Sequence, residues 1–532
     1  MSQSTSKQSS STLFSPEGAK SEYFEEPKAE QLYHVYTRRQ KLACSRIVLL
    51  VSLAAAFSPL ASNIYFPALE IIAKATHSTP ETTSLTVTVY MVAQGIAPSI
   101  WGPIADCVGR RQVLIYTLLL FVGANVGLAL SSSIHMIMVF RVLQAAGSSS
   151  TISIASGAGV IADIAPPAER GGFIGLFAGI RQAALALGPV LGGVLGGTMG
   201  YRSIFWFLCI FGSAVTLLLV VFLPETHRGI AGNGSVPLDN NLMYPPLLSP
   251  FAPWKCERAK AFAESENPAS TLDERPKLSW KIFLEPAKFL TEKDVACTLF
   301  FGAIVYTVYS MVTSSMTFLL TQYYGLGTVE IGASFIPNGV GCILGSMIAG
   351  RTMDQDYAAY STAYHLKNGQ PPRKKQPPAD FPLERARLSQ VPFLTAIFVI
   401  ATVAYGLCLR HDQRAILALP LIAQFVQGYA ATAVLNVNNT LTVDLYPGKS
   451  ASATAANNLA RCLVGAIGVS FTEEALGPDR LTPTVLFAIL AGVVVLCAPS
   501  QIIGWRWGPK WRAQRMERLE AQKLRQQETE SS

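Results

Sequence analysis

Three arginines lie inside otherwise apolar segments that are about as long as a membrane is thick: Arg141, Arg181 and Arg461. An ionised side chain in a bilayer costs free energy, so a residue of this kind usually serves a function. A guanidinium stays charged at physiological pH and binds a carboxylate through two parallel hydrogen bonds. None of the three has an obvious acidic partner nearby in its own segment. They therefore predict a site for organic anions.

Two of these arginines are expected at the same depth. Arg170 and Lys449 each lie at the start of an apolar segment. Arg181 lies further along the first of these segments, and Arg461 lies further along the second. A helix rises 1.5 Å per residue, so both arginines lie roughly 16–18 Å along the helix axis, near the middle of a bilayer.

Polar side chains recur at helical spacing in several of these segments, as on one face of a helix. Gln144, Asn438, Asn458 and Tyr306 are predicted to join the arginines in binding a ligand. The alternative is that polar side chains only form hydrogen bonds between helices. The polar sets are Ser58, Ser62 and Tyr65; Arg141, Gln144 and Ser148; Tyr306, Ser310, Thr313 and Thr317; Gln424, Gln427 and Asn438; and Thr454, Asn458 and Arg461.

The composition is that of a membrane protein. Of 532 residues, 50% are hydrophobic and 14% are charged, whereas soluble domains carry about 25% charged residues. We expect an all-α polytopic membrane protein with about twelve transmembrane helices. The apolar runs begin near Ile47, Leu85, Val113, Met136, Ile174, Ile204, Val295, Ile331, Val391, Ile416, Ala451 and Pro483.

The distribution of basic residues predicts the orientation. Most of the 42 Lys and Arg fall before the first span, between Arg228 and Lys293, between Arg351 and Arg387, or after Arg506. This positive-inside bias places both termini in the cytosol. The net charge of +8 is thereby explained by topology, and no nucleic-acid partner is expected. The N-terminal region shows no cleavable signal peptide pattern.

A long polar interruption divides the apolar segments into two sets of six, as in transporters built from repeats. The predicted regions are a cytoplasmic N-tail (1–45), a first six-helix bundle (46–223), a cytoplasmic linker (224–292), a second six-helix bundle (293–505) and a basic cytoplasmic C-tail (506–532).

The fifth apolar segment contains a cluster of glycines around a proline: Gly188, Pro189, Gly192 and Gly193. Proline removes a helical hydrogen bond, and glycine lets a neighbouring helix approach closely. We expect a bent helix that can move, although small residues also pack membrane helices without any such role.

The loop after the second segment has an ordered pattern of Gly102, Asp106, Gly109, Arg110 and Arg111, and a weaker copy follows the eighth segment. The arginines are predicted to reach Asp163 or Glu169 and to clamp two helices. Such a clamp must break before the cytoplasmic side can open.

Together these motifs resemble the major facilitator superfamily. The loop is similar to its hallmark cytoplasmic motif, and residues 186–193 are similar to its antiporter motif. Arg141, Gln144 and Gly147 are similar to a fourth-span pattern, from which Ala145 departs. Residues 62–69 resemble the twelve-span drug:proton antiporter family. Residues 381–388 and 438–462 resemble its fungal branch of quinidine-resistance, dityrosine and itaconate exporters.

The resemblance implies the major facilitator fold, with two six-helix bundles that rock around a central site. The fifth and eleventh spans of this fold are related by a pseudo-two-fold axis, so Arg181 and Arg461 would face one cavity. Cation exporters of the superfamily usually carry a carboxylate in the first or fourth span, where this chain has Ser62 and Asn63 in the first. We therefore expect an exporter of organic anions in the plasma membrane. A multidrug:proton antiporter and a non-transporting receptor are the alternatives.

Proton coupling is implied by the resemblance but has no clear carrier. The remaining carboxylates are peripheral, so protons could instead travel with the substrate, or the membrane potential could drive efflux. No enzymatic, metal or cofactor site is expected, and the partners are a small-molecule substrate and the lipid bilayer around a monomer. These carboxylates are Glu70, Asp106, Asp163, Asp444, Glu473 and Glu474.

Overall fold

The computed structural model describes residues 38–155, 159–164, 170–227, 230, 285–368, 381–409, 417–446, 450–476 and 480–531. Every regular element in this part of the chain is a helix. Residues 1–37 of the predicted N-tail and most of the predicted linker lie outside the described residues, as do Ile416, Lys449 and Glu169. Residues 38–45 of that predicted tail belong to the first helix instead.

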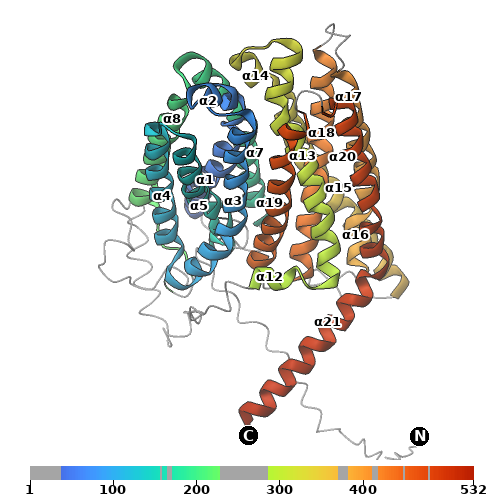
Figure 1. The fold of residues 1–532 in the computed structure, drawn as a ribbon. Helices are drawn as coiled ribbons and strands as arrows, with labels where there is room; N and C mark the ends of the chain where they lie inside the picture. Colours follow the sequence, from blue (N-terminus) through green and yellow to red (C-terminus); the bar gives the residue numbers. More distant parts are fainter. Residues whose placement is uncertain are drawn as a thin grey trace, which may run out of the picture.

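The described residues of the first half form six long helices, which lie together on one side of the molecule (Figure 1). Local signals set their ends: Thr79 accepts a hydrogen bond from the Thr82 amide to cap α3, and Gly109 and Gly200 separate successive helices with positive φ angles. The elements are α1 (Arg38–Asn63), η1 (Phe66–Ala68), α2 (Leu69–Ala75), α3 (Pro80–Val108), α4 (Arg110–Leu130), α5 (Ile134–Ala155), α6 (Val160–Ile164), α7 (Arg170–Met199) and α8 (Tyr201–Phe222).

The second half repeats this arrangement on the other side (Figure 1). The last helix, α21, continues from α20 and extends away from the helical body. The elements are α12 (Glu285–Phe289), α13 (Lys293–Tyr324), α14 (Thr328–Ser334), α15 (Ile336–Asn368), α16 (Leu383–Leu388), α17 (Val391–Cys408), α18 (Ala418–Leu445), α19 (Ser450–Ala475), α20 (Pro483–Cys497) and α21 (Pro499–Ser531).

Within the described residues, nine segments are long and apolar enough to cross a membrane. The helices α3, α5 and α19 are not among them, although the sequence predicts spans there. They carry the polar residues Gln94, Arg141, Gln144, Asn458 and Arg461, which lower their hydropathy. The eighth predicted span also differs, because Ile331 lies in the short α14 and the long α15 begins only at Ile336.

Two apolar cores form, and the core of the first half extends onto α13, α14 and α19 of the second half. Large apolar side chains also face outward, as lipid-facing residues do. Ile210 and Phe393 are 68% and 70% exposed. The halves meet along two lines: α3 packs against α19, and α7 packs against α14 and α15. Arg181 and Arg461 lie on α7 and α19, two of the helices that form these contacts.

Candidate functional site

Arg461 on α19 is half-buried and held by neutral groups. Its Nε and Nη2 donate hydrogen bonds to Oδ1 of Asn458, at 3.2 and 2.9 Å. Its Cζ lies 5.1 Å from the centroid of the Tyr306 ring on α13, within the range of a cation–π interaction. Arg461, Asn458 and Tyr306, all predicted site residues, therefore lie together. Neither Asn458 nor Tyr306 neutralises the charge of the Arg461 guanidinium.

The Asn458 side chain also joins the two halves of the protein. Its Nδ2 donates a 2.8 Å hydrogen bond to the carbonyl oxygen of Gln94 on α3. The Gln94 side chain in turn donates to Oγ of Ser58 on α1, at 3.0 Å. Gly95 permits this close packing, since a Cβ there would lie 3.0 Å from Cβ of Cys462. No sequence pattern identified Gln94, because its partner lies 364 residues away.

Arg181 on α7 is also half-buried, and its charge is close enough to that of Arg461 for the two to repel each other. Within the described residues, no carboxylate lies at ion-pair distance from either arginine. The neighbouring Gln182 donates a 3.2 Å hydrogen bond to the carbonyl oxygen of Cys342 on α15. The second contact line between the halves thus runs directly beside Arg181.

Arg141 has a different environment, since it is fully buried inside the first half. Its Cζ lies 4.1 Å from the ring centroids of both Tyr65 and Tyr90. Its Nη1 donates to the Ala61 carbonyl at 3.1 Å and to Oε1 of Gln144 at 2.8 Å. A substrate could touch Arg141 or Gln144 in this conformation only after the two tyrosines moved.

Asn438 is likewise buried, inside the second half. It packs against Gly302 of α13, where an added Cβ would lie 3.1 Å from its Nδ2. Neither polar atom of its side chain has a hydrogen-bond partner in the described part of the chain. As with Arg141 and Gln144, its contact with a substrate stays a prediction.

The predicted cytoplasmic clamp is built within the first half. Arg110 contacts Asp106 at 2.7 Å and Asp163 at 3.2 Å, so the predicted contact with Asp163 is present. Arg111 donates from Nη2 to the Val220 carbonyl at 2.8 Å. Gly102, by contrast, has open space around it.

Glu225, which follows α8, is a central residue of this loop that the sequence patterns did not identify. Its carboxylate accepts hydrogen bonds from the backbone amides of Arg110 and Arg111, at 3.0 and 3.2 Å, at the start of α4. Burial raises the pKa of this carboxyl, while the amide donors oppose that shift by stabilising the charged form. Gly109 lies against the carboxylate, where a Cβ would be 2.6 Å from Oε2.

The glycine cluster of α7 lies where the helix packs most closely on its neighbours. A Cβ on Gly192 would overlap the carbonyl of Ile64 on the chain after α1. A Cβ on Gly193 would lie 2.8 Å from the Cα of Gly332 on α14. Pro189 lies within the continuous helix α7 and contributes its carbonyl to the Gly332 contact. A larger residue in place of Gly193 would force the halves apart at this end.

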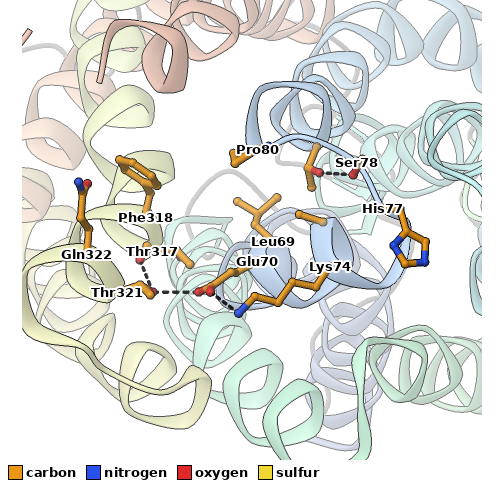
Figure 2. Close-up of a pocket in the computed structure, with 12 residues that line it drawn as sticks. Leu69, Glu70, Lys74, His77, Ser78, Pro80, Thr317, Phe318, Thr321 and Gln322 are labelled. Atoms are coloured by element: carbon orange, nitrogen blue, oxygen red, sulfur yellow. Dashed lines mark hydrogen bonds and ion pairs between the residues drawn. The ribbon is translucent and has the colours of Figure 1, made fainter. Parts of the chain in front are cut away.

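A pocket of about 480 Å³ lies near the same end, between α2, the start of α3 and α13 (Figure 2). Glu70 contacts Lys74 at 2.6 Å and accepts a 3.1 Å hydrogen bond from Thr321 of the second half. Thr317 donates to the Phe66 carbonyl at 3.0 Å. These contacts join the halves at the end that the sequence predicts to face outward.

Comparison with known proteins gives consistent matches along the chain. Residues 51–469 match the family model of the Major Facilitator Superfamily. Citrate exporter 1 of Aspergillus niger is 44% identical over 92% of this chain and 90% of its own length. Multidrug transporter QDR2 of Candida glabrata is 33% identical over 88% of this chain and 80% of its own.

Among solved structures, the human organic anion transporter MFSD10 (TETRAN) matches with a TM-score of 0.52 at 18% identity, over 86% of this chain and 99% of its own. At that identity the match concerns the fold alone. It agrees with the predicted all-α architecture.

Proposed function

The chain belongs to the major facilitator superfamily, and from this premise we propose that it exports organic anions by alternating access of its two halves around Arg181 and Arg461. It is a multi-pass membrane protein related to transporters of small organic compounds. The proposal concerns the charge of the substrate, the residues that bind it and the plasma-membrane location.

The observation that carries the proposal is the pair of uncompensated arginines. Arg181 and Arg461 come from opposite halves, repel each other and have no carboxylate at ion-pair distance among the described residues. Unpaired charges away from water cost free energy, which an anionic ligand would recover. A cationic ligand would add a third positive charge and is disfavoured.

The relatives support the same substrate class. A citrate exporter is 44% identical to this chain over most of both lengths. If both termini face the cytosol, a membrane potential that is negative inside favours the exit of an anion, by about 2.3 kcal/mol per charge per 100 mV. Outward transport of a multiply charged acid would need no further energy source at low external concentration.

Proton-coupled export of drugs is the second candidate. It is favoured by relatives that include Multidrug transporter QDR2 and, at 30% identity, Quinidine resistance protein 1 of Saccharomyces cerevisiae. The first-span region contains no carboxylate that would bind a cation: Asn63 donates its amide to the Pro59 carbonyl at 2.8 Å. Anion export is therefore the primary proposal.

Uptake of radiolabelled citrate into inside-out vesicles tests it, with and without an imposed proton gradient. We expect Arg181→Ala and Arg461→Ala to reduce uptake about tenfold or more. Arg506→Ala, which removes an exposed arginine on α21, is the matched control. Wild-type rates in both variants at equal expression would overturn the proposal, and gradient-dependent uptake of cationic drugs would favour the second candidate.

A further inference from the structure

We propose that the pocket between α2 and α13 is a second binding site, for a small uncharged and mostly apolar molecule that holds the two halves together at this end. The site is separate from the proposed anion site, because neither Arg181 nor Arg461 lines the pocket. The inference follows from the size of the pocket, the chemistry of its walls and its position between the halves.

The pocket is large enough for a small organic ligand, and both halves contribute to its walls. Its volume of about 480 Å³ lies within the range of about 300–1,000 Å³ that is usual for small-molecule sites. The lining residues of the first half lie between Leu69 and Thr83, on α2 and the start of α3. Those of the second half lie between Thr317 and Gln322, on α13. A molecule bound here would therefore touch both halves.

The charged groups at the pocket neutralise each other. Nζ of Lys74 lies 2.6 Å from Oε1 of Glu70, and Thr321 donates to the other carboxylate oxygen at 3.1 Å. Figure 2 shows these three side chains joined in a row, with the exposed His77 and Gln322 on opposite sides of the view. A charged ligand would have to break the Glu70–Lys74 pair or stay unpaired, and an unpaired charge away from water costs free energy. The pocket thus favours an uncharged ligand.

The hydroxyl groups that line the pocket already donate hydrogen bonds within the protein. Thr317 donates to the Phe66 carbonyl and Thr83 to the Thr79 carbonyl, each at 3.0 Å, and the Ser78 hydroxyl lies 2.9 Å from that of Thr83. A hydroxyl has one proton but two acceptor lone pairs. These groups can therefore still accept a hydrogen bond, but they offer no proton to a carboxylate. An apolar ring system with one donating hydroxyl fits this arrangement. The apolar wall residues are Leu69, Ala73, Pro80 and Phe318.

The position of the pocket gives a bound molecule an effect on the transport cycle. Thr321 reaches Glu70, and Thr317 reaches the Phe66 carbonyl, across the boundary between the halves. Opening of this end would move α13 away from α2 and remove one wall of the site. A ligand that binds the closed arrangement better shifts the population toward it. The occupied protein would therefore open less often at this end.

Three naphthalene compounds of similar shape test the ligand class: 2-naphthol, 2-naphthoate and 2-naphthylmethylammonium. Binding of each to the full-length protein in lipid nanodiscs is measured by equilibrium dialysis, with protein-free nanodiscs as the blank. We expect the Kd of 2-naphthol to be at least about tenfold lower than that of either ion. Equal or tighter binding of 2-naphthoate would overturn the proposal. Because no transport is measured, the result is independent of whether the protein exports anions.

Substitutions at the pocket locate the bound naphthol. Ala73→Leu places a larger side chain in the pocket, while Ala75→Leu changes an exposed residue of the same helix that does not line it. We expect a clear rise in the Kd of 2-naphthol in Ala73→Leu and no change in Ala75→Leu. Phe318→Ala, which removes apolar wall surface, should also raise the Kd, so the test does not depend on one variant. Wild-type affinity in both pocket variants would place the ligand elsewhere and overturn the proposal.

A disulfide between α7 and α14 reports whether the ligand holds the halves together. A Cβ on Gly197 would lie 3.5 Å from the Cβ of Thr328, a separation that suits a disulfide. We expect 2-naphthol to speed disulfide formation in Gly197→Cys/Thr328→Cys at least about twofold, and 2-naphthoate to leave it unchanged. The single variants control for the protein's own free cysteines. A rate that saturating 2-naphthol leaves unchanged or lowers would show that the bound molecule does not favour the closed arrangement.

Discussion

Asn458 contacts both the candidate site and the opposite half of the protein, since its Oδ1 accepts from Arg461 while its Nδ2 donates to the Gln94 carbonyl at 2.8 Å. One side chain thereby orients the arginine and joins α19 to α3. Under the proposed function, this residue would connect substrate binding at Arg461 with the contact between the halves.

Asn458→Asp should abolish citrate uptake. The new carboxylate would have nearly the same size but would pair with Arg461, which removes the positive charge that attracts the substrate. We expect the KM for citrate in inside-out vesicles to rise at least about tenfold. Asn458→Ala should have a smaller effect, because Arg461 keeps its charge. An unchanged KM in Asn458→Asp would show that Arg461 does not bind the substrate.

Arg141→Ala should destabilise the protein, in contrast with Arg461→Ala. Arg141 is fully buried between Tyr65 and Tyr90, and each cation–π contact away from water is worth about 2 kcal/mol. We expect a clear fall in Tm in detergent for Arg141→Ala. Arg461→Ala, at a half-buried position, should keep its Tm and lose transport. A normal Tm with lost citrate binding in Arg141→Ala would instead make Arg141 a ligand contact.

The sequence predicted the helices and some of the contacts of the arginines. It did not predict Tyr90, which packs against Arg141, or Gln94, which accepts from Asn458. Spacing from the segment starts placed Arg181 and Arg461 at equal depth, which stays a prediction. Tyr90 and Gln94 were missed because a tyrosine or glutamine in an apolar segment has no local pattern. Their roles arise only from packing with helices far along the chain, 364 residues in the case of Gln94.

The same limit applies to the loop between α3 and α4. The contact between Arg110 and Asp163 was predictable, because opposite charges stood at the ends of two predicted spans. Glu225 was not, because it lies 115 residues along the chain from Arg110, where its carboxylate accepts from two backbone amides and faces the charge of Arg111. The role of Asp106 as part of a clamp stays a prediction.

Gly109→Ala should destabilise the protein more than Gly102→Ala. Gly109 has a φ of 128°, which is strained for any residue with a Cβ, and its Cβ would lie 2.6 Å from Oε2 of Glu225. The expected cost is about 1–3 kcal/mol. Gly102 has open space around it and serves as the control. Equal Tm values for the two variants would contradict this account of the loop.

A covalent link between positions 70 and 321 should stop transport reversibly. Glu70 accepts a hydrogen bond from Thr321 at 3.1 Å, which joins α2 of the first half to α13 of the second (Figure 2). The halves must separate here if the substrate is to leave on this side. We expect Glu70→Cys/Thr321→Cys, treated with a short reducible crosslinker, to lose citrate transport and to recover it after reduction.

The control for this experiment is each single variant with the same crosslinker, because the protein already contains buried and partly buried free cysteines. Transport in the single variants should be unaffected. If the crosslinked double variant transports citrate at the untreated rate, the two positions need not separate during the cycle. The pocket beside them would then lie outside the exit path.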